Sequence, residues 1–419
     1  MSKNIKGAIP KWRFESFDSY PKWNIKKLGC LMQPINERAG DKKYVLMSVT
    51  SGVGLIPQVE KFGREIAGNS YKNYYVIRKN DFAYNKSSTK EFPEGYISML
   101  KEYEEAAIPN SIFTCFRIID DEYEPLFFEQ LFNTNYHGKW LRKYIEIGAR
   151  AHGALSIDTK HLWNMPVAVP KLPEQQKIAD CLSSIDDLIS TEEKKLSLLN
   201  DYKKGWMQRL FPKEGKTVPE WRFPEFRDDN NWKCVEIETV GKVITGKTPP
   251  TSNDSLWNGS IQFVTPTDIV GDKYQRLAQR TVVKTSKIKV LPKGTIMFTC
   301  IASIGKMAIS VYPCVTNQQI NSIITNKGYY NEFIYYSLFR NVNKIKSDLS
   351  NTTVPIINKT DFSKIKISVT LNEKEQEKIA NFLSGIDELI SNQKEKIEKL
   401  KQHKKALMQG LFPTIEEVL

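Results

Sequence analysis

The chain has 419 residues, with 61 lysines and arginines against 48 aspartates and glutamates, and therefore a formal net charge of +13 and a pI near 9.2. This length exceeds that of one ordinary domain, and a hydrophobic content of 40% excludes a disordered basic tail. The sequence has no apolar run long enough to span a membrane, no signal-peptide-like start and no CxxC pair, so we expect a reduced, cytoplasmic protein without disulfides or bound zinc.

The positive charge is confined to two of four successive blocks. Residues 1–170 carry net +5, residues 171–215 are neutral, residues 216–370 carry net +9, and residues 371–419 carry net −1. A basic protein either meets an anionic polymer or is charged for solubility, and the concentration of charge in two blocks favours the polymer.

The two basic blocks, 1–170 and 216–370, are predicted to be mixed α/β domains. Their β-rich runs, which alternate with turn residues, are 44–49, 74–77, 261–264 and 295–299. Helical stretches follow at residues 126–131 and 332–339.

The two neutral blocks, 171–215 and 371–419, are predicted to be long helices of about 36 residues each. Apolar residues step by three and four along each helix, in a stripe interrupted at Glu192 and Lys203 and, at the same places, at Gln393 and Lys404. We assign these stripe residues to the spacer helices and their pairing: Ile178, Leu182, Ile185, Ile189, Leu196, Leu199, Ile379, Leu383, Ile386, Ile390, Ile397 and Leu400. Two surface helices, each on its own domain, are the alternative, but so narrow a stripe favours an antiparallel coiled coil between two units related by a pseudo-two-fold axis.

The blocks form an internal repeat, in which residues 216–419 follow the plan of residues 1–215. The matching runs are PKWRF (10–14) with PEWRF (219–223), EQQKIA (174–179) with EQEKIA (375–380), and MQRLFP (207–212) with MQGLFP (408–413). One copy runs directly into the next at the centre, whereas the same pieces are cut apart at the termini. We therefore expect a closed, pseudo-circular arrangement in which the two ends of the chain lie close together.

No set of catalytic residues is apparent. The run from Gly241 to Thr248 fits the phosphate-loop pattern GxxxxGK[ST], but Pro249 and Pro250 follow, so the helix that such a loop requires is not expected. The four histidines have no metal-ligand spacing, and the chain has no nucleophile elbow, no dinucleotide loop and no Asn-Pro-Pro-aromatic motif. The cysteines without a nearby base, which we expect to be buried thiols, are Cys115, Cys300 and Cys314.

Two basic domains held apart by paired helices resemble a dimeric DNA reader folded into one chain. Such readers meet two half-sites on one duplex, one helical turn or more apart. Because the two domains differ in sequence, we expect two different half-sites and thus an asymmetric, bipartite target.

At this point the pattern is similar to the specificity subunit of type I restriction–modification enzymes. The residues that carry the resemblance are the EQQKIA/EQEKIA, IDDLIS/IDELIS and QRLFP/QGLFP runs, the PxWRF openers, and, in the second domain, residues 246–249, 264–269, 291–295 and 316–320. In the first domain, residues 82–87 and 93–95 play a similar part. The resemblance covers essentially the whole chain and implies target recognition domains at 1–170 and 216–370, with spacer helices at 171–215 and 371–419.

The resemblance implies a non-catalytic subunit that binds double-stranded DNA. It would position two modification subunits, which methylate adenine N6 with S-adenosylmethionine, and would be joined by motor–nuclease subunits that use ATP and Mg²⁺. The cofactors would then belong to the partners, and this chain would bind none. We interpret the acidic pairs Asp186-Asp187 and Asp387-Glu388 as solvated helix faces rather than partner contacts.

The candidate DNA-binding residues combine basic, hydroxyl and amide side chains suited to phosphates and base edges. They are Tyr84, Asn85, Lys86 and Ser87 in the first domain, and Lys247, Thr248, Thr265, Thr267, Lys306, Asn317 and Gln318 in the second. Asn317 and Gln318 suit adenine edges, and equally suit hydrogen bonds to their own loops. A stand-alone DNA-binding regulator, or a coiled-coil adaptor whose basic domains bind an acidic protein, are the rival functions.

Overall fold

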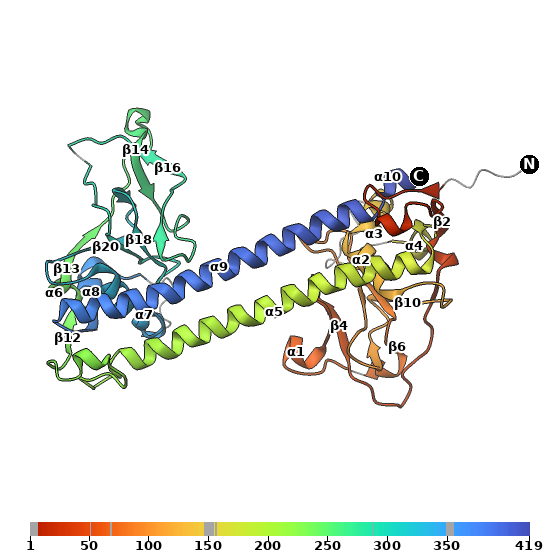
Figure 1. Cartoon of the computed structure of the whole chain (residues 1–419), viewed down its shortest axis with the longest axis horizontal. Helices are drawn as coiled ribbons and strands as arrows, with labels where there is room; N and C mark the ends of the chain where they lie inside the picture. The colour runs from red at the N-terminus through yellow and green to blue at the C-terminus, as the bar shows by residue number, and fades with distance from the viewer. Residues whose placement is uncertain are drawn as a thin grey trace, which may run out of the picture. The chain divides into compact units, whose positions relative to one another are not determined.

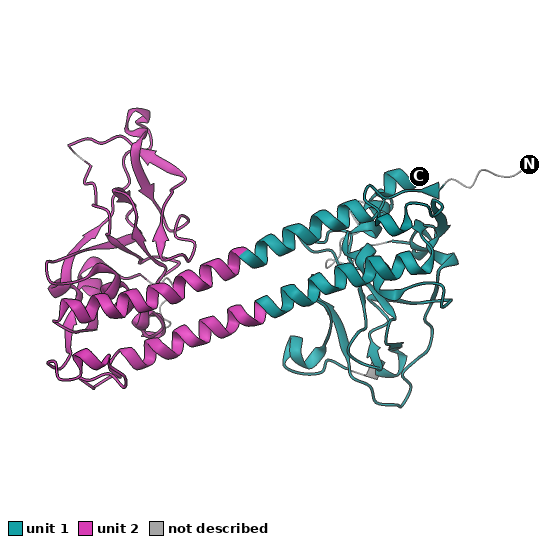
Figure 2. Cartoon of the chain, viewed as in Figure 1, with its two compact units in different colours: residues 1–192, 396–419 teal, residues 193–395 magenta. Residues whose placement is uncertain are grey.

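The computed structural model describes residues 7–50, 52–67, 69–145, 155, 157–286, 288–348 and 356–419. The chain packs into two units (Figure 2): unit 1 comprises residues 1–192 and 396–419, and unit 2 comprises residues 193–395. Each unit contains one basic block and a part of both long helices, α5 (Leu172–Leu210) and α9 (Glu373–Leu411). The predicted boundaries thus fall next to the helix starts, but by packing each long helix is shared between the units rather than forming a domain of its own.

Unit 1 consists of small antiparallel sheets covered by short helices (Figure 1). Its sheets have the strand orders β1–β2–β11 and β3–β10–β7–β8, with the additional pairs β4–β5 and β6–β9. The strands are β1 (Gly7–Ala8), β2 (Trp23–Lys27), β3 (Met32–Pro34), β4 (Met47–Thr50), β5 (Gly54–Pro57), β6 (Tyr75–Arg78), β7 (Phe82–Asn85), β8 (Tyr96–Met99), β9 (Glu105–Ile108), β10 (Phe113–Ile118) and β11 (Pro166–Val169). The short helices are α1 (Gln58–Phe62), α2 (Pro125–Asn133), α3 (Tyr136–Leu141), α4 (Thr159–Trp163) and α10 (Ile415–Val418).

Unit 2 has a larger central sheet, with the strand order β13–β20–β17–β18–β15. A second sheet, β16–β14–β19, stands beside it, and β12 pairs with β21. The strands are β12 (Lys233–Glu236), β13 (Gly241–Thr245), β14 (Trp257–Val264), β15 (Tyr274–Gln275), β16 (Arg280–Val282), β17 (Ile296–Thr299), β18 (Met307–Ser310), β19 (Cys314–Thr316), β20 (Ile320–Thr325) and β21 (Lys366–Val369). The helices are α6 (Ile237–Val240), α7 (Asn331–Asp348) and α8 (Lys359–Ser363). The predicted strands and helices of both basic blocks are therefore present. Most ends differ by a few residues, but α7 continues to Asp348, well beyond the predicted end at residue 339.

The repeated motifs build the same buried contact in each unit. In unit 1 the guanidinium of Arg13 donates to both carboxylate oxygens of Glu174, at 2.8 and 2.7 Å. In unit 2 Arg222 does the same to Glu375, at 2.6 and 2.7 Å. The PxWRF opener and the EQxKIA run thus recur together because each supplies one half of a bidentate ion pair.

The expected closure of unit 1 by the two ends of the chain is confirmed. The backbone N–H of Trp12 donates to the carbonyl of Gly410 at 2.8 Å, and in unit 2 Trp221 donates to Arg209 at 3.0 Å. A Cβ at Gly410 would lie 2.1 Å from the Trp12 ring, so the position of this ring requires glycine, whereas unit 2 accommodates Arg209 at the same place. The same contact is therefore made across the chain ends in unit 1 and across the continuous junction in unit 2.

Aromatic side chains complete the repeated core. Phe127 packs against Trp23 and Phe412 in unit 1, with ring centroids 5.8 and 5.2 Å apart. The corresponding residues of unit 2 pack in the same way: Phe333 lies 5.5 Å from both Trp232 and Phe211. The Leu-Phe-Pro run that ends each long helix thus supplies a core residue as well as a helix stop.

Polar residues that interrupt the helix stripes take part in ion pairs between α5 and α9. In unit 1 Lys404 lies 2.6 Å from Asp186, and Lys396 lies 2.5 Å from Glu192. In unit 2 Lys203 lies 2.5 Å from Asp387. Within unit 1 the partners descend along α9 as they ascend along α5, which is the order of an antiparallel pair.

The ion pair with Lys203 corrects the interpretation of Asp387 as a solvated face, whereas Asp186 is paired but its side chain is still 41% exposed. Asp187 and Glu388 are exposed as expected. The apolar stripe residues divide into two groups. Those that are buried are Ile178, Leu182, Ile189, Ile379, Leu383, Ile386, Ile390 and Ile397, and those that are half-buried are Ile185, Leu196, Leu199 and Leu400. The first residues of each stripe pack into the cores of the units, so the stripe serves domain docking as well as the opposite helix.

The predicted buried thiols are confirmed: Cys115, Cys300 and Cys314 are at most 2% exposed. Burial raises the pKa of Cys300 and of Cys314 to about 11. Across the described ranges, no helix is long and apolar enough to cross a bilayer. Nor do the described residues contain a cluster of three His, Cys, Asp or Glu side chains that would suit a metal ion.

Candidate nucleic-acid interface

The predicted residues of unit 2 gather where β14 and β19 end. These two strands are parallel, so the segments that follow them leave the sheet at the same edge. The backbone N–H of Asn317 donates to the carbonyl of Val264 at 3.1 Å and joins the two segments. Thr265 and Thr267 are thereby brought to the same edge as Asn317 and Gln318.

Lys247 and Thr248 reach this edge from the end of β13. The hydroxyl of Thr248 donates to the side-chain oxygen of Gln318 at 2.6 Å, and Lys247 is exposed. The approach depends on Gly246, because a Cβ there would lie 2.1 Å from the carbonyl oxygen of Asn317. Glycine is needed here for backbone contact rather than for a phosphate.

The prediction that no helix directly follows the run from Gly241 to Thr248 is confirmed. Its first five residues form strand β13, and no α-helix begins after Thr248 before β14. The residues that follow β13 instead line a cavity of about 750 Å³, to which the apolar Ile288 and Leu291 and the basic Lys289 also contribute.

Lys306 joins the cluster from the turn between β17 and β18. Its Nζ donates to the carbonyl of Pro266 at 3.4 Å, between the two candidate threonines. Gly305 before it has a φ of +84°, and a Cβ at this position would lie 2.6 Å from Val342, so the turn requires glycine. The seven candidates of unit 2 therefore occupy one surface, although they come from four segments of the chain.

Not all of these side chains are available to a ligand. The hydroxyl of Thr265 donates to Asp268 at 2.7 Å, and the amide of Asn317, a residue only 7% exposed, donates to Gln319 at 2.9 Å. These two residues shape their own loops, as the alternative interpretation of Asn317 anticipated. The candidates whose side chains are exposed are Lys247, Thr267, Lys306 and Gln318.

In unit 1 the prediction for Tyr84 requires correction. Tyr84 lies in β7, a central strand covered on both faces, and is 1% exposed. Its hydroxyl donates to the carbonyl of Glu94 at 2.7 Å, and its ring packs 5.8 Å from His137. Tyr84 is therefore a core residue and does not present a surface to a base.

The other three candidates of unit 1 lie at the end of β7 and just after it. Asn85 is 8% exposed and accepts the backbone N–H of Ser87 at 3.0 Å, while Lys86 and Ser87 are half-buried. Asn85 and Ser87 line a cavity of about 610 Å³ together with Lys61 and Lys90. Base contacts by this group stay a prediction.

The sequence did not single out Lys61, which lies in the short helix α1. Its ammonium group donates to the hydroxyl of Ser48 and the carbonyl of Val49, at 3.3 and 3.2 Å, and burial lowers its pKa. No sequence pattern marks it, because α1 and β4 meet only in the folded unit.

The chain matches the family described as type I restriction modification DNA specificity domain, over residues 33–201 and 229–402. These two matches cover most of the chain, one on each copy of the repeat, and the chain therefore belongs to this family. It is 33% identical over 195 residues to the type I restriction enzyme MjaIX specificity subunit of Methanocaldococcus jannaschii, a match that covers 44% of this chain and 45% of the relative. The MjaVIII specificity subunit of the same organism is 27% identical over 304 residues, covering 66% and 68%.

Solved structures share the fold across nearly the whole chain. A type I restriction–modification system S subunit from M. genitalium superposes with a TM-score of 0.60 at 13% identity, covering 96% of this chain and 99% of the other. A chain from a study of complex assembly and conformational transition of the type I R-M system gives 0.53 at 18% identity, covering 94% and 98%. At these identities the likeness shows the fold alone.

Proposed function

We propose that the chain is the DNA sequence-specificity subunit of a type I restriction–modification complex, with one unit reading each half of an asymmetric, bipartite target. Its family membership supports this class, and the chain spans less than half the length of the MjaIX subunit that it matches. One observation carries the proposal furthest. The buried Arg–Glu pair recurs in both units, whereas the surfaces around Lys86 and Lys306 are built from unrelated segments.

A non-catalytic role in the complex fits this arrangement. We propose that adenine methylation with S-adenosylmethionine belongs to two modification subunits, and that ATP and Mg²⁺ are used by motor–nuclease subunits. This chain would contribute the DNA surface and the two long helices, which we propose to form an antiparallel coiled-coil spacer between the recognition domains.

The exposed face of the long helices suits two copies of one partner. Leu188 of α5 and Leu389 of α9 occupy the same place in the repeat, and they are 42% and 56% exposed. Each follows an exposed acidic residue, Asp187 or Glu388. A leucine that both copies of the repeat leave in solvent is suited to a docking contact made twice, and we propose the modification subunit as its occupant.

Co-purification tests this docking. We expect L188D and L389D each to reduce the recovered modification subunits from two to one, and the double variant to recover none. L198D is the matched control, because Leu198 is 68% exposed on the same helix but has a lysine, Lys399, at its place in the other copy. Loss of both partner subunits with L198D alone, or retention of both in the double variant, would exclude the docking site.

The target itself is tested by mapping adenine methylation in a genome where the chain is expressed with its modification subunit. We expect one split motif with two different halves. A stand-alone regulator, the second candidate, predicts sequence-specific DNA binding without a co-purifying methyltransferase and without new methylation.

A further inference from the structure

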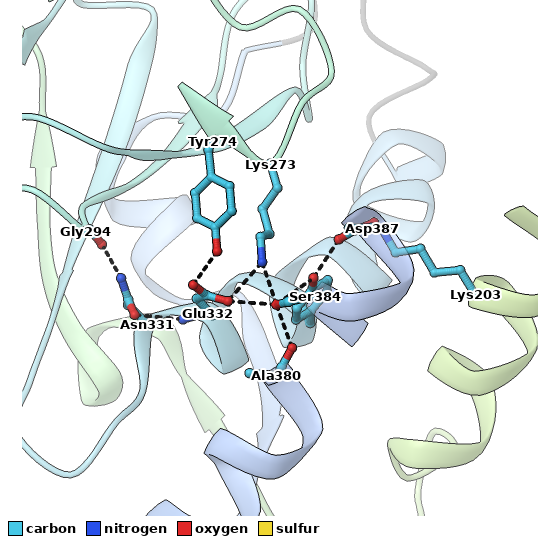
Figure 3. A network of polar contacts seen from close by, with 10 residues as sticks. Lys203, Lys273, Tyr274, Gly294, Asn331, Glu332, Ala380, Ser384 and Asp387 are labelled. Atoms are coloured by element: carbon cyan, nitrogen blue, oxygen red, sulfur yellow. Dashed lines mark hydrogen bonds and ion pairs between the residues drawn. The ribbon is translucent and has the colours of Figure 1, made fainter. Parts of the chain in front are cut away.

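In unit 2 a buried polar network joins the edge of the central sheet to α9 (Figure 3). Lys273, the residue before β15, is buried, and its ammonium group donates to Glu332 at 2.9 Å and to Ser384 at 2.6 Å. Glu332 also accepts the hydroxyl of Tyr274 at 2.5 Å. One lysine thus connects a strand of the recognition sheet, the start of α7 and the middle of α9.

The network stabilises the charges that it buries. Glu332 lies in the first turn of α7, where the helix dipole favours a carboxylate. Burial by itself would raise its pKa, but hydrogen bonds from Tyr274, Lys273 and Ser384 hold the pKa of Glu332 below its ordinary value. Glu332 is therefore charged at neutral pH, and the ammonium group of Lys273 is its ion-pair partner.

The network lies next to the candidate reading loop. Residues 265–273 connect β14 to β15 and carry Thr265 and Thr267 at one end and Lys273 at the other. Asp268 holds the middle of this loop by accepting the backbone N–H groups of Thr265 and Gln279, each at 2.8 Å. The position of the two threonines is therefore tied, through one short segment, to α9.

Unit 1 has no counterpart of this ion pair at the corresponding places among its described residues. Gln175 accepts the backbone N–H of Glu124 before α2, at 2.9 Å, and Gln376 accepts the backbone N–H of Tyr330 before α7, at 2.7 Å. Glu124 therefore corresponds to Tyr330, and two residues further on Leu126 corresponds to Glu332. The serine is kept, as Ser183, but the place of the carboxylate is taken by the apolar Leu126. Unit 1 instead pairs Lys101 with Glu129, and that lysine is 49% exposed.

A buried ion pair of this kind adds little net stability, because desolvation offsets the attraction, but it fixes one geometry. Resting on the function proposed above, we propose that Lys273, Glu332 and Ser384 are positioning residues that fix the reading loop of unit 2 on α9 and thereby set the spacing at which the second half-site is accepted. The network would act on spacing and not on the bases read.

Adenine methylation mapping with the whole complex tests this inference through the variant K273M/E332L, which gives unit 2 the leucine found in unit 1. We expect the same two half-site sequences, but about a tenfold rise in methylation of sites whose spacer is one base pair longer or shorter. S384A removes the hydrogen bond that connects the ion pair to α9 but keeps the ion pair itself, and alanine is well tolerated in a helix. It should therefore change the accepted spacer length in the same direction as K273M/E332L, with a smaller effect. S183A in unit 1 is the matched control and should leave the spacing unchanged.

The outcomes separate the inference from the function on which it rests. If the unaltered complex yields no split motif, the proposed function fails. If it yields the motif and both K273M/E332L and S384A keep its single spacing, the positioning role fails although the function stands. A loss of second half-site bases without a change in spacing would also overturn the inference, because it would assign these residues to base reading or to folding.

Discussion

Unit 1 and unit 2 share their scaffold contact by contact but differ in how their reading surfaces are held. Both bury a bidentate Arg–Glu pair and an aromatic triad, and both form an interhelical lysine–aspartate pair. Among the residues described, only unit 2 links a buried ion pair beside its recognition sheet to a long helix, through the hydrogen bond from Lys273 to Ser384. The comparison indicates that the contacts that close each unit are the same in both copies of the repeat. The contacts that hold the recognition surface differ between the copies, as the recognition surfaces themselves do.

The largest expected effect concerns the shared scaffold. R222M leaves Glu375, which is fully buried, without its guanidinium partner, and should lower the free energy of unfolding of unit 2 by about 3–5 kcal/mol. R13M should weaken unit 1 by a similar amount, because Glu174 is only 1% exposed. Urea unfolding, monitored by hydrogen exchange at the backbone amides of each unit, measures both changes in the free energy of unfolding.

K213A is the control for this pair of variants, because the Lys213–Glu220 ion pair is exposed to solvent and should contribute little to stability. If R13M and R222M cost no more than K213A, or if they differ strongly from each other, the two units do not share a common buried scaffold.

A smaller expected effect is a difference between the two units in how their stability depends on pH. All four histidines lie in unit 1, and burial lowers the pKa of His137 to about 4. The unfolded state binds the proton more readily, so the stability that neutral His137 provides is present above pH 6.5 and is lost as the pH falls toward 4. The loss is about 3 kcal/mol at most, and it should appear as faster hydrogen exchange in unit 1 but not in unit 2.

H137Q should remove this difference, since glutamine does not titrate in that range. Equal pH dependence of the two units in the unaltered protein, or an unchanged dependence in H137Q, would contradict the assignment to His137.

The smallest effect concerns the interhelical pairs. Asp387 accepts the hydroxyl of Tyr336 at 2.6 Å as well as Lys203, and its side chain is 20% exposed, whereas that of Asp186 is 41% exposed. D387N should therefore cost about 1–2 kcal/mol and D186N less than about 1 kcal/mol. Thermal unfolding of the two variants checks the order, and a larger loss for D186N would reverse the comparison.

The scaffold could be predicted from the sequence because its residues recur in both copies of the internal repeat. The WRF and EQxKIA runs recur, and polar breaks in the stripe, such as Lys203 and Lys404, recur at equal spacing, although the sequence does not reveal their partners. The Lys273–Glu332 pair occurs once and joins residues far apart in the chain, so no pattern marks it. Tyr84 was misplaced because a polar-aromatic run on a central strand, covered on both faces, resembles a surface run when only its composition is known.

The central claim is that each unit reads one half-site, and a crossed binding measurement tests it most directly. The whole complex, with K86A in unit 1 or K306A in unit 2, is titrated against DNA in which one half-site or the other is scrambled. The account predicts that K86A abolishes discrimination at one half-site and spares the other, and that K306A does the reverse. If either substitution weakens discrimination equally at both half-sites, the assignment of one half-site to each unit is wrong.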